Sequence, residues 1–197
     1  MIQIFEEGYF SNNRITEARL SDVKSETRMF NSTGRITGRT TVFLSHKHDD
    51  LIELKEFIGF LENKYRVDVY IDSKDPGMPE NTSGETATRL KTIIKKCDKF
   101  ILLATDNAIE SKWCNWELGF GDAQKYKQNI AILPIKKKGN YDFQYKGNEY
   151  LYIYPYIAYY EGTEKYTNGE YVPAGYYIVS QDANEHKTIN SLSNWFK

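Results

Sequence analysis

One glutamate, Glu117, lies in an apolar stretch of the sequence, SKWCNWELGFGDAQKYK (residues 111–127). The stretch has a helical pattern, and in a helix Trp113 would share a face with Glu117, because side chains four positions apart lie together. An ordinary helical glutamate faces solvent, which is one alternative for Glu117. The apolar neighbours leave only a narrow polar face, however, and a half-buried carboxylate loses hydration free energy unless something binds it. Glu117 is therefore a candidate functional residue.

A carboxylate beside an indole ring is suited to chemistry at a sugar. The carboxylate can bind a ribose hydroxyl group and stabilise an oxocarbenium-like transition state. The indole ring can stack on a base at the same time. Trp113 and Glu117 together therefore favour a ligand that carries both a ribose and a base.

Further polar residues follow apolar segments that have the pattern of buried strands. Ser45, His46 and Lys47 stand at the end of one such segment, and Asp72 ends the next. In open parallel α/β sheets, ligands bind in the crevice at the carboxyl ends of the strands. We therefore expect these residues to lie near the substrate, beside the helix that carries Glu117.

A long loop is predicted after Asp72, over residues 73–84. It contains two prolines, two glycines and many polar residues, and includes the turn former Pro76-Gly77. Long loops in compact domains are often functional, so this loop is a second region of interest.

The elements that must position these residues follow an alternating order. The predicted strands are apolar throughout and cover residues 40–45, 67–72, 100–105 and 130–135. Helical patterns separate them, the first with apolar residues at three-and-four spacing after a cap at Asp49 or Asp50. Buried strands that alternate with helices predict an α/β fold, in which a mostly parallel central sheet has helices on both faces.

The two ends of the chain differ from this repeating part. Residues 1–38 contain a moderately helical stretch and then a segment rich in turn formers, so we predict an N-terminal helical appendage and linker. The main domain would span 39–197, with its core at 40–135. Over 150–197 tyrosine dominates, and we expect a strand at 150–160, in which Pro155 indicates the sheet edge or a break. A second strand at 175–180 is expected to pair with it, and a closing helix is expected at 189–196.

The composition narrows the function classes. With 26 Lys+Arg against 27 Asp+Glu, no global charge recruits nucleic acid or an anionic membrane. No apolar run approaches a membrane span and the start lacks the features of a secretory signal, so we expect a cytoplasmic protein. Cys97 and Cys114 are the only cysteines, and we expect both to be reduced and buried.

Three further signals are weak. Gly119-Phe120-Gly121 resembles the start of a dinucleotide fingerprint, but Gln124 occupies the third glycine position and the segment lies within a helix. The run from His46 to Asp50 offers metal ligands but lacks a completing motif, so we expect no metal and no bound cofactor. The lysines at 136–138 have the pattern of a solvated loop.

Taken in order, three segments resemble a bacterial TIR (Toll/interleukin-1 receptor) domain. TVFLSHKHDD resembles the family's first strand ending in serine, and VDVYIDSKDPGMP resembles its second strand with an acidic residue and a Pro-Gly loop. SKWCNWELGFGDA resembles its third-helix Trp-x-x-x-Glu motif. The resemblance covers residues 40–135, and we expect it to extend to the closing helix. It implies a flavodoxin-like three-layer fold, to which the residues of this chain add a Tyr-rich C-terminal β extension that departs from the family.

The resemblance also implies an activity, that of an NAD⁺ glycohydrolase or cyclase. Such an enzyme cleaves the nicotinamide–ribose bond of its substrate NAD⁺ and gives nicotinamide with ADP-ribose or a cyclic ADP-ribose isomer. Glu117 matches the family's catalytic glutamate and Trp113 the tryptophan one turn before it. Ser45, His46 and Lys47 match the loop that lines the nucleotide pocket, and Asp72 matches the acid after the second strand. The resemblance therefore implies that all six residues belong to the NAD⁺ site.

The family context suggests partners. Loop 73–84, with Pro76 and Gly77, would support self-association, and a nucleotide signal would pass to an effector protein, as in the TIR component of Thoeris antiphage defence. Two rival functions remain. One is a non-catalytic TIR-type scaffold in which Glu117 is structural, and the other is an enzyme related to nucleoside deoxyribosyltransferases, which also use a glutamate on a sugar.

Overall fold

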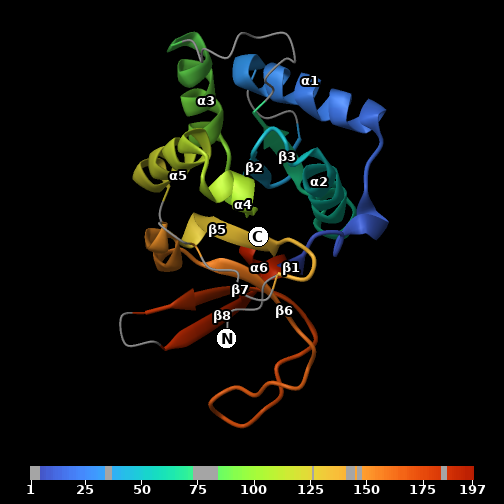
Figure 1. Ribbon diagram of the computed structural model, residues 1–197, viewed down its shortest axis with the longest axis vertical. Helices are drawn as coiled ribbons and strands as arrows, with labels where there is room; N and C mark the ends of the chain where they lie inside the picture. The colour runs from blue at the N-terminus through green and yellow to red at the C-terminus, as the bar shows by residue number, and fades with distance from the viewer. Residues whose placement is uncertain are drawn as a thin grey trace.

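The computed structural model describes residues 5–33, 37–72, 84–125, 127–140, 145, 148–182 and 186–197. Its strands form one eight-stranded sheet (Figure 1). The strands are β1 (Phe5–Glu6), β2 (Thr41–Ser45), β3 (Asp68–Ile71), β4 (Lys99–Ala104), β5 (Ile130–Lys136), β6 (Tyr156–Tyr160), β7 (Gly175–Gln181) and β8 (Lys187–Ser191). The four strands predicted for the repeating part of the chain are therefore confirmed as β2, β3, β4 and β5.

The order of the strands creates a crevice above β2. The sheet runs β3-β2-β4-β5-β6-β7-β8, with parallel pairing from β3 to β6 and antiparallel pairing from β6 to β8, while β1 pairs with β5. The chain leaves β2 for β3 on one side and later returns to β4 on the other. Such a reversal of direction is where ligands bind in open α/β sheets.

Helices cover both faces of the sheet, as predicted. They are α1 (Glu17–Thr33), α2 (Leu51–Tyr65), α3 (Gly84–Lys96), α4 (Asp106–Ile109), α5 (Lys112–Gln124) and α6 (Leu192–Trp195), with short 3₁₀ helices η1 (Ser11–Asn13), η2 (Lys127–Asn129) and η3 (Glu149–Ile153). In Figure 1, α2 lies on the opposite side of the sheet from α3 and α5. No helix of the described ranges is long and apolar enough to cross a bilayer.

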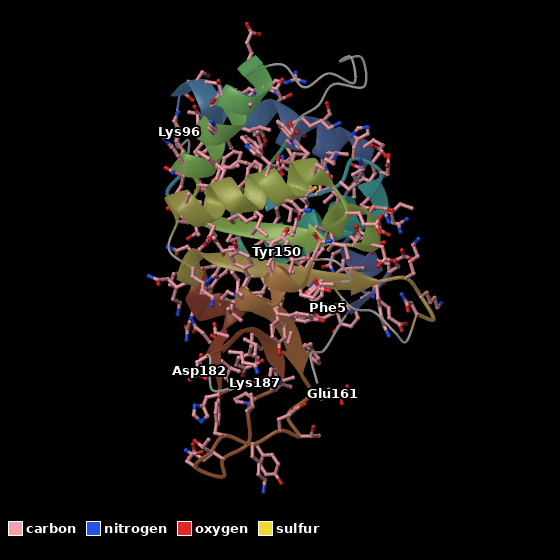
Figure 2. All side chains as sticks on the ribbon, turned by 60° about the vertical axis from the view of Figure 1, so that its left-hand side comes forward. Phe5, Lys96, Tyr150, Glu161, Asp182 and Lys187 are labelled. Carbon is pink, nitrogen blue, oxygen red and sulfur yellow. The ribbon has the colours of Figure 1, made fainter. Side chains whose placement is uncertain are left out.

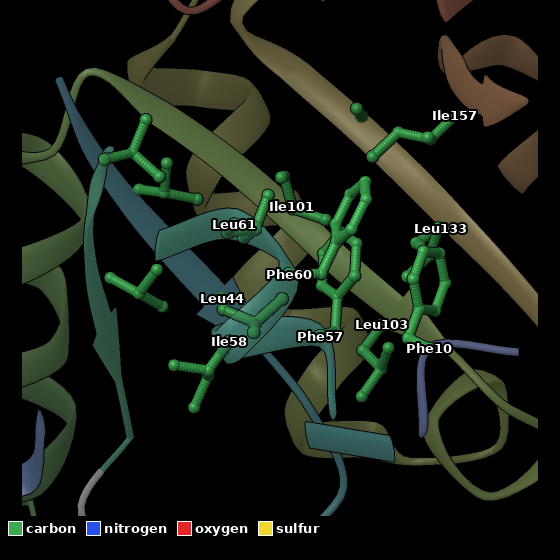
Figure 3. Close-up of a cluster of buried hydrophobic side chains, with 14 of the residues drawn as sticks. Phe10, Leu44, Phe57, Ile58, Phe60, Leu61, Ile101, Leu103, Leu133 and Ile157 are labelled. Atoms are coloured by element: carbon green, nitrogen blue, oxygen red, sulfur yellow. The ribbon is translucent and has the colours of Figure 1, made fainter. Parts of the chain in front are cut away.

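Alternate strand residues separate into two hydrophobic clusters, one on each face. Leu44 belongs to the cluster with α2, where Phe57 and Phe60 pack with Leu103 (Figure 3). Phe43, the residue before Leu44, belongs to the cluster with α3 and α5. Each parallel strand is therefore buried on both sides, which explains why the strands are apolar throughout.

The N-terminal segment packs against the main sheet. Phe5 and Phe10 are 2% and 3% exposed and belong to the same cluster as α2, and Figure 3 shows Phe10 beside Phe57. The boundary predicted at residue 38 stays a prediction, but the described part of residues 1–38 does not stand apart from the sheet. Phe5 and Phe10 come from a two-residue strand and a turn, which are too short to show a periodic pattern in the sequence.

Helix α1 lies along the outer side of β3, the first strand of the sheet order. The Ile71 backbone N–H donates to Thr27 Oγ1 at 3.3 Å, and the Phe30 and Tyr70 rings stack with centroids 4.0 Å apart. A side chain of α1 thus satisfies a backbone donor on the outer strand.

The C-terminal region differs in part from the prediction. The segment 150–160 is interrupted at Pro155, as one of the two alternatives for this proline predicted: η3 precedes it and only β6 is a strand, because proline cannot donate to a sheet. The predicted pairing of 175–180 with this strand is confirmed. The helix predicted over 189–196 is shorter, because Ile189 pairs with Val179 in β8 and α6 begins only after Ser191.

The tyrosine-rich region also contacts the helix that carries Glu117. The Tyr150 hydroxyl donates to Asn115 Oδ1 at 2.6 Å, which places Tyr150 next to α5 (Figure 2). The C-terminal region therefore helps to hold α5 in place.

Candidate active site

Glu117 is buried against the end of β2. Its side chain is 1% exposed, and the Ser45 hydroxyl donates to Glu117 Oε2 at 2.5 Å. Ser111 is the N-cap residue of α5: its hydroxyl oxygen accepts a hydrogen bond from the Cys114 backbone N–H at 3.3 Å. The alternative that Glu117 faces solvent is therefore wrong. Instead, strand and helix together hold a carboxylate inside the protein.

Cys114 shares this buried environment. The thiol is 1% exposed, and burial together with the nearby charge of Glu117 raises its pKa to about 11. At neutral pH the thiol is therefore protonated, and a protonated thiol is a poor nucleophile. Cys114 contributes packing around Glu117 rather than covalent chemistry.

Trp113 links α5 to the end of β3. Its indole Nε1–H donates to Asp72 Oδ2 at 3.2 Å, and its ring stacks on Trp116 with centroids 4.7 Å apart. The two contacts set the orientation of the indole ring. Two residues 41 positions apart, one at the end of β3 and one at the start of α5, are thus brought together where the parallel strands end.

A small pocket opens at this edge of the sheet. Its lining residues come from the β2–α2 loop, the end of β3 and the start of α5, and they are His46, Lys47, His48, Asp72, Ser111 and Trp113. Ser45 and Glu117 are not among these lining residues, but each is close in the chain to one of them. Ser45 directly precedes His46, and Glu117 lies one helical turn after Trp113. The structure therefore brings together the six predicted residues that it describes.

His46 is held in a defined orientation on the pocket wall. Its ring Nδ1 lies 3.4 Å from the Leu44 carbonyl oxygen, and the side chain is half-buried. Burial lowers the pKa of His46 to about 4. The ring is therefore neutral at pH 7.

Asp50 is a buried residue whose role the sequence analysis missed. It precedes α2 as expected, but its carboxylate does not cap that helix. It accepts from Thr105 Oγ1 at 2.5 Å and from Asn107 Nδ2 at 2.7 Å, while its backbone N–H donates to the Lys47 carbonyl at 3.0 Å. Asp50 thus fastens the pocket-lining loop to the segment after β4. One sequence signal could have indicated this role: Asp50 follows β2, and its partners Thr105 and Asn107 follow the neighbouring strand β4.

The other predicted features contribute less to the described site. Pro76 and Gly77 lie outside the described residues. Lys136 pairs with Glu6 at 3.2 Å, and Gly119 lies on the exposed side of α5. Within the described ranges, no group of three or more His, Cys, Asp or Glu residues is arranged to hold a metal ion.

The hydrogen bond between Ser45 and Glu117 predicts a measurable contribution to stability. We expect Ser45→Ala to lower the free energy of unfolding by about 1–3 kcal/mol, because a buried carboxylate loses a donor that water cannot readily replace. Urea unfolding at pH 7 measures this change. The exposed Ser25 provides the control, because Ser25→Ala should change the free energy of unfolding by less than about 0.5 kcal/mol. Equal effects of the two substitutions would contradict the prediction.

Two comparisons with known proteins bear on this arrangement. A family model described as TIR domain matches residues 42–165, which include the pocket-lining residues and Glu117. A protein of Bacillus cereus (strain MSX-D12), named probable 3′ cyclic ADP-D-ribose synthase ThsB′, is 38% identical over 120 residues. The match covers 59% of this chain and 60% of that protein, so it spans less than two thirds of the relative's length.

Proposed function

Because the chain belongs to the TIR domain family, we propose that it is an enzyme that cleaves the nicotinamide–ribose bond of NAD⁺. The proposed products are nicotinamide and a cyclic isomer of ADP-ribose, in agreement with the printed name of the Bacillus cereus relative. Capture of the same intermediate by water would give ADP-ribose instead. NAD⁺ is the substrate, and the proposal requires no bound cofactor.

The observation that carries this proposal is the buried carboxylate of Glu117 beside a pocket that contains an oriented indole ring. NAD⁺ lies across the strand ends, with its nicotinamide ribose toward Glu117 and its base-sized rings against Trp113. Because Glu117 is 1% exposed and bonded to Ser45, the ribose hydroxyl groups must displace the Ser45 hydroxyl to reach it. Binding of substrate therefore includes an opening of the pocket floor at Ser45.

Glu117 acts through its charge. As the bond between C1′ and the nicotinamide nitrogen breaks, the electron pair leaves with nicotinamide, which becomes a neutral molecule. Positive charge then develops on the ribose, and a preorganised carboxylate in a dry site can stabilise that charge by several kcal/mol. Nicotinamide leaves without accepting a proton, so no general acid is needed for this step.

The proposal extends to the cellular role. The cyclic product would serve as a signal to an effector protein in antiphage defence, in the cytoplasm where NAD⁺ is available. Self-association through loop 73–84 would complete the site, as the resemblance to the family implies. These are the expectations carried by the family resemblance.

Nicotinamide release from NAD⁺ tests the proposed function. We expect concentrated protein to release nicotinamide, with faster release in a crowding agent that favours association. Chromatography with mass detection identifies the nucleotide product, since the cyclic isomer is lighter than ADP-ribose by one water. Turnover of nucleosides without turnover of NAD⁺ would instead indicate a deoxyribosyltransferase-like enzyme. No release under any condition, including extracts of phage-infected cells, would favour the scaffold.

A further inference from the structure

His46 has one ring nitrogen committed and one available. Nδ1 faces the Leu44 carbonyl oxygen at 3.4 Å, and a carbonyl oxygen can only accept a hydrogen bond. The proton of the neutral ring must therefore be on Nδ1. Nε2 is left with its lone pair, and the side chain that carries it lines the pocket.

The pocket needs a proton acceptor at a later stage of the reaction. A ring can close when a hydroxyl group of the same molecule attacks C1′, and the attacking oxygen must then lose its proton. We infer that Nε2 of His46 is the general base that accepts this proton, so that His46 directs the reaction toward the cyclic product. This inference rests on the proposed function and assigns a role within the same site.

The step is balanced in atoms and electrons. The C1′–nicotinamide bond breaks and nicotinamide takes the electron pair. The hydroxyl oxygen forms the new bond to C1′, and its proton moves to Nε2 and from there to solvent. Nothing is oxidised or reduced. The lowered pKa of His46 keeps the ring unprotonated before the step, and a weak base is sufficient because a hydroxyl oxygen bonded to C1′ becomes strongly acidic.

The other polar groups of the pocket are less suited to this task. The Lys47 ammonium group has donors only, and Asp72 Oδ2 already accepts from Trp113. The Ser45 hydroxyl group donates its hydrogen bond to Glu117, and the charge of Glu117 is needed to stabilise the cationic ribose. His48 is exposed at the rim. His46 combines a neutral ring, a fixed tautomer and a half-buried position.

Two substitutions separate the proposed role of Nε2 as a base from the hydrogen bond that Nδ1 makes to the Leu44 carbonyl oxygen. His46→Asn keeps an amide N–H near the position of Nδ1, so that the hydrogen bond to Leu44 can form, but it removes Nε2. His46→Gln places a polar but non-basic group near the position of Nε2. We expect both variants still to release nicotinamide, at a reduced rate because His46 lines the pocket, while the ratio of cyclic product to ADP-ribose falls at least 10-fold.

Added imidazole provides the decisive readout. In His46→Ala, imidazole should restore the cyclic product in proportion to its concentration, which a merely structural role would not produce. His186→Ala is the matched control, because His186 is exposed near the start of β8 and should leave both the rate and the product ratio unchanged. Circular dichroism and thermal unfolding check that each variant is folded.

The outcomes are distinguishable. The inference would be overturned if folded His46→Asn and His46→Gln gave the wild-type ratio of cyclic product to ADP-ribose. It would also be overturned if imidazole did not restore the cyclic product in His46→Ala. Loss of nicotinamide release together with the cyclic product would place His46 in bond cleavage and would also overturn it. If the wild-type protein releases no nicotinamide, the proposed function itself has failed.

Discussion

Glu117→Gln should release nicotinamide from NAD⁺ about 10³-fold more slowly than the wild-type protein. Glutamine keeps the shape of the side chain and an oxygen that accepts from Ser45, but it removes the negative charge. If that charge stabilises the cationic ribose by about 4 kcal/mol, its loss corresponds to a 10³-fold slower step. Initial rates of nicotinamide release at saturating NAD⁺ measure the effect.

Glu110→Gln is the matched control for this prediction. Glu110 is an exposed glutamate seven positions earlier in the chain, directly after α4, and its replacement should leave the rate unchanged. Both variants should unfold within about 1 kcal/mol of the wild-type protein, since neither opens a cavity. A folded Glu117→Gln variant with an undiminished rate would assign Glu117 to structure alone and remove the basis of the proposed mechanism.

Gly59→Ala should lower the free energy of unfolding by about 2–3 kcal/mol, the largest stability effect we expect from adding a single methyl group. A Cβ atom at Gly59 would lie 1.8 Å from the Asn13 carbonyl oxygen and 3.0 Å from the Ile15 side chain. The first of these contacts is with backbone, so no change of rotamer can relieve it. The N-terminal segment would have to move away from α2, which would disturb the packing of Phe10 against Phe57.

Gly119→Ala separates this clash from the general effect of alanine in a helix. Gly119 lies in α5 with no atom within 4 Å of a Cβ at that position, so alanine should stabilise the protein by up to about 1 kcal/mol through helix propensity. Urea unfolding of the two variants gives the comparison. Opposite signs are expected, and a stabilising effect of Gly59→Ala would show that residues 11–15 are displaced from α2 without cost.

The parallel part of the fold could be predicted because its signals are local. Each of the strands β2, β3, β4 and β5 is buried on both faces and therefore reads as an apolar run, and α2 shows apolar three-and-four spacing. Strand β1 has two residues and α4 has four, which is too short for a periodic pattern. In β8, Ile189 is stabilised by its partner Val179 on another strand, and the segment itself carries no clear strand pattern.

The candidate site could be predicted as a set of residues but not as a geometry. Ser45 and Glu117 are 72 positions apart, and their hydrogen bond depends on how α5 packs across β2. The sequence could place Ser45 at a strand end and Glu117 on a helix, but it could not show that Glu117 is sealed beneath the pocket. Asp50 was missed because an aspartate before a helix is usually a cap, whereas here its partners are Thr105 and Asn107.

The contact of α1 with β3 has a consequence for assembly. A strand at the edge of a sheet offers unpaired backbone groups to any extended chain, which can lead to aggregation. At β3 the Ile71 N–H is already occupied by the Thr27 hydroxyl, and the Phe30 ring covers Tyr70. Growth of the sheet by strand addition is therefore disfavoured at β3 and is directed to β8 at the other end of the strand order. The contact between α1 and β3 thus protects this edge of the sheet from fibril-like pairing as the protein accumulates.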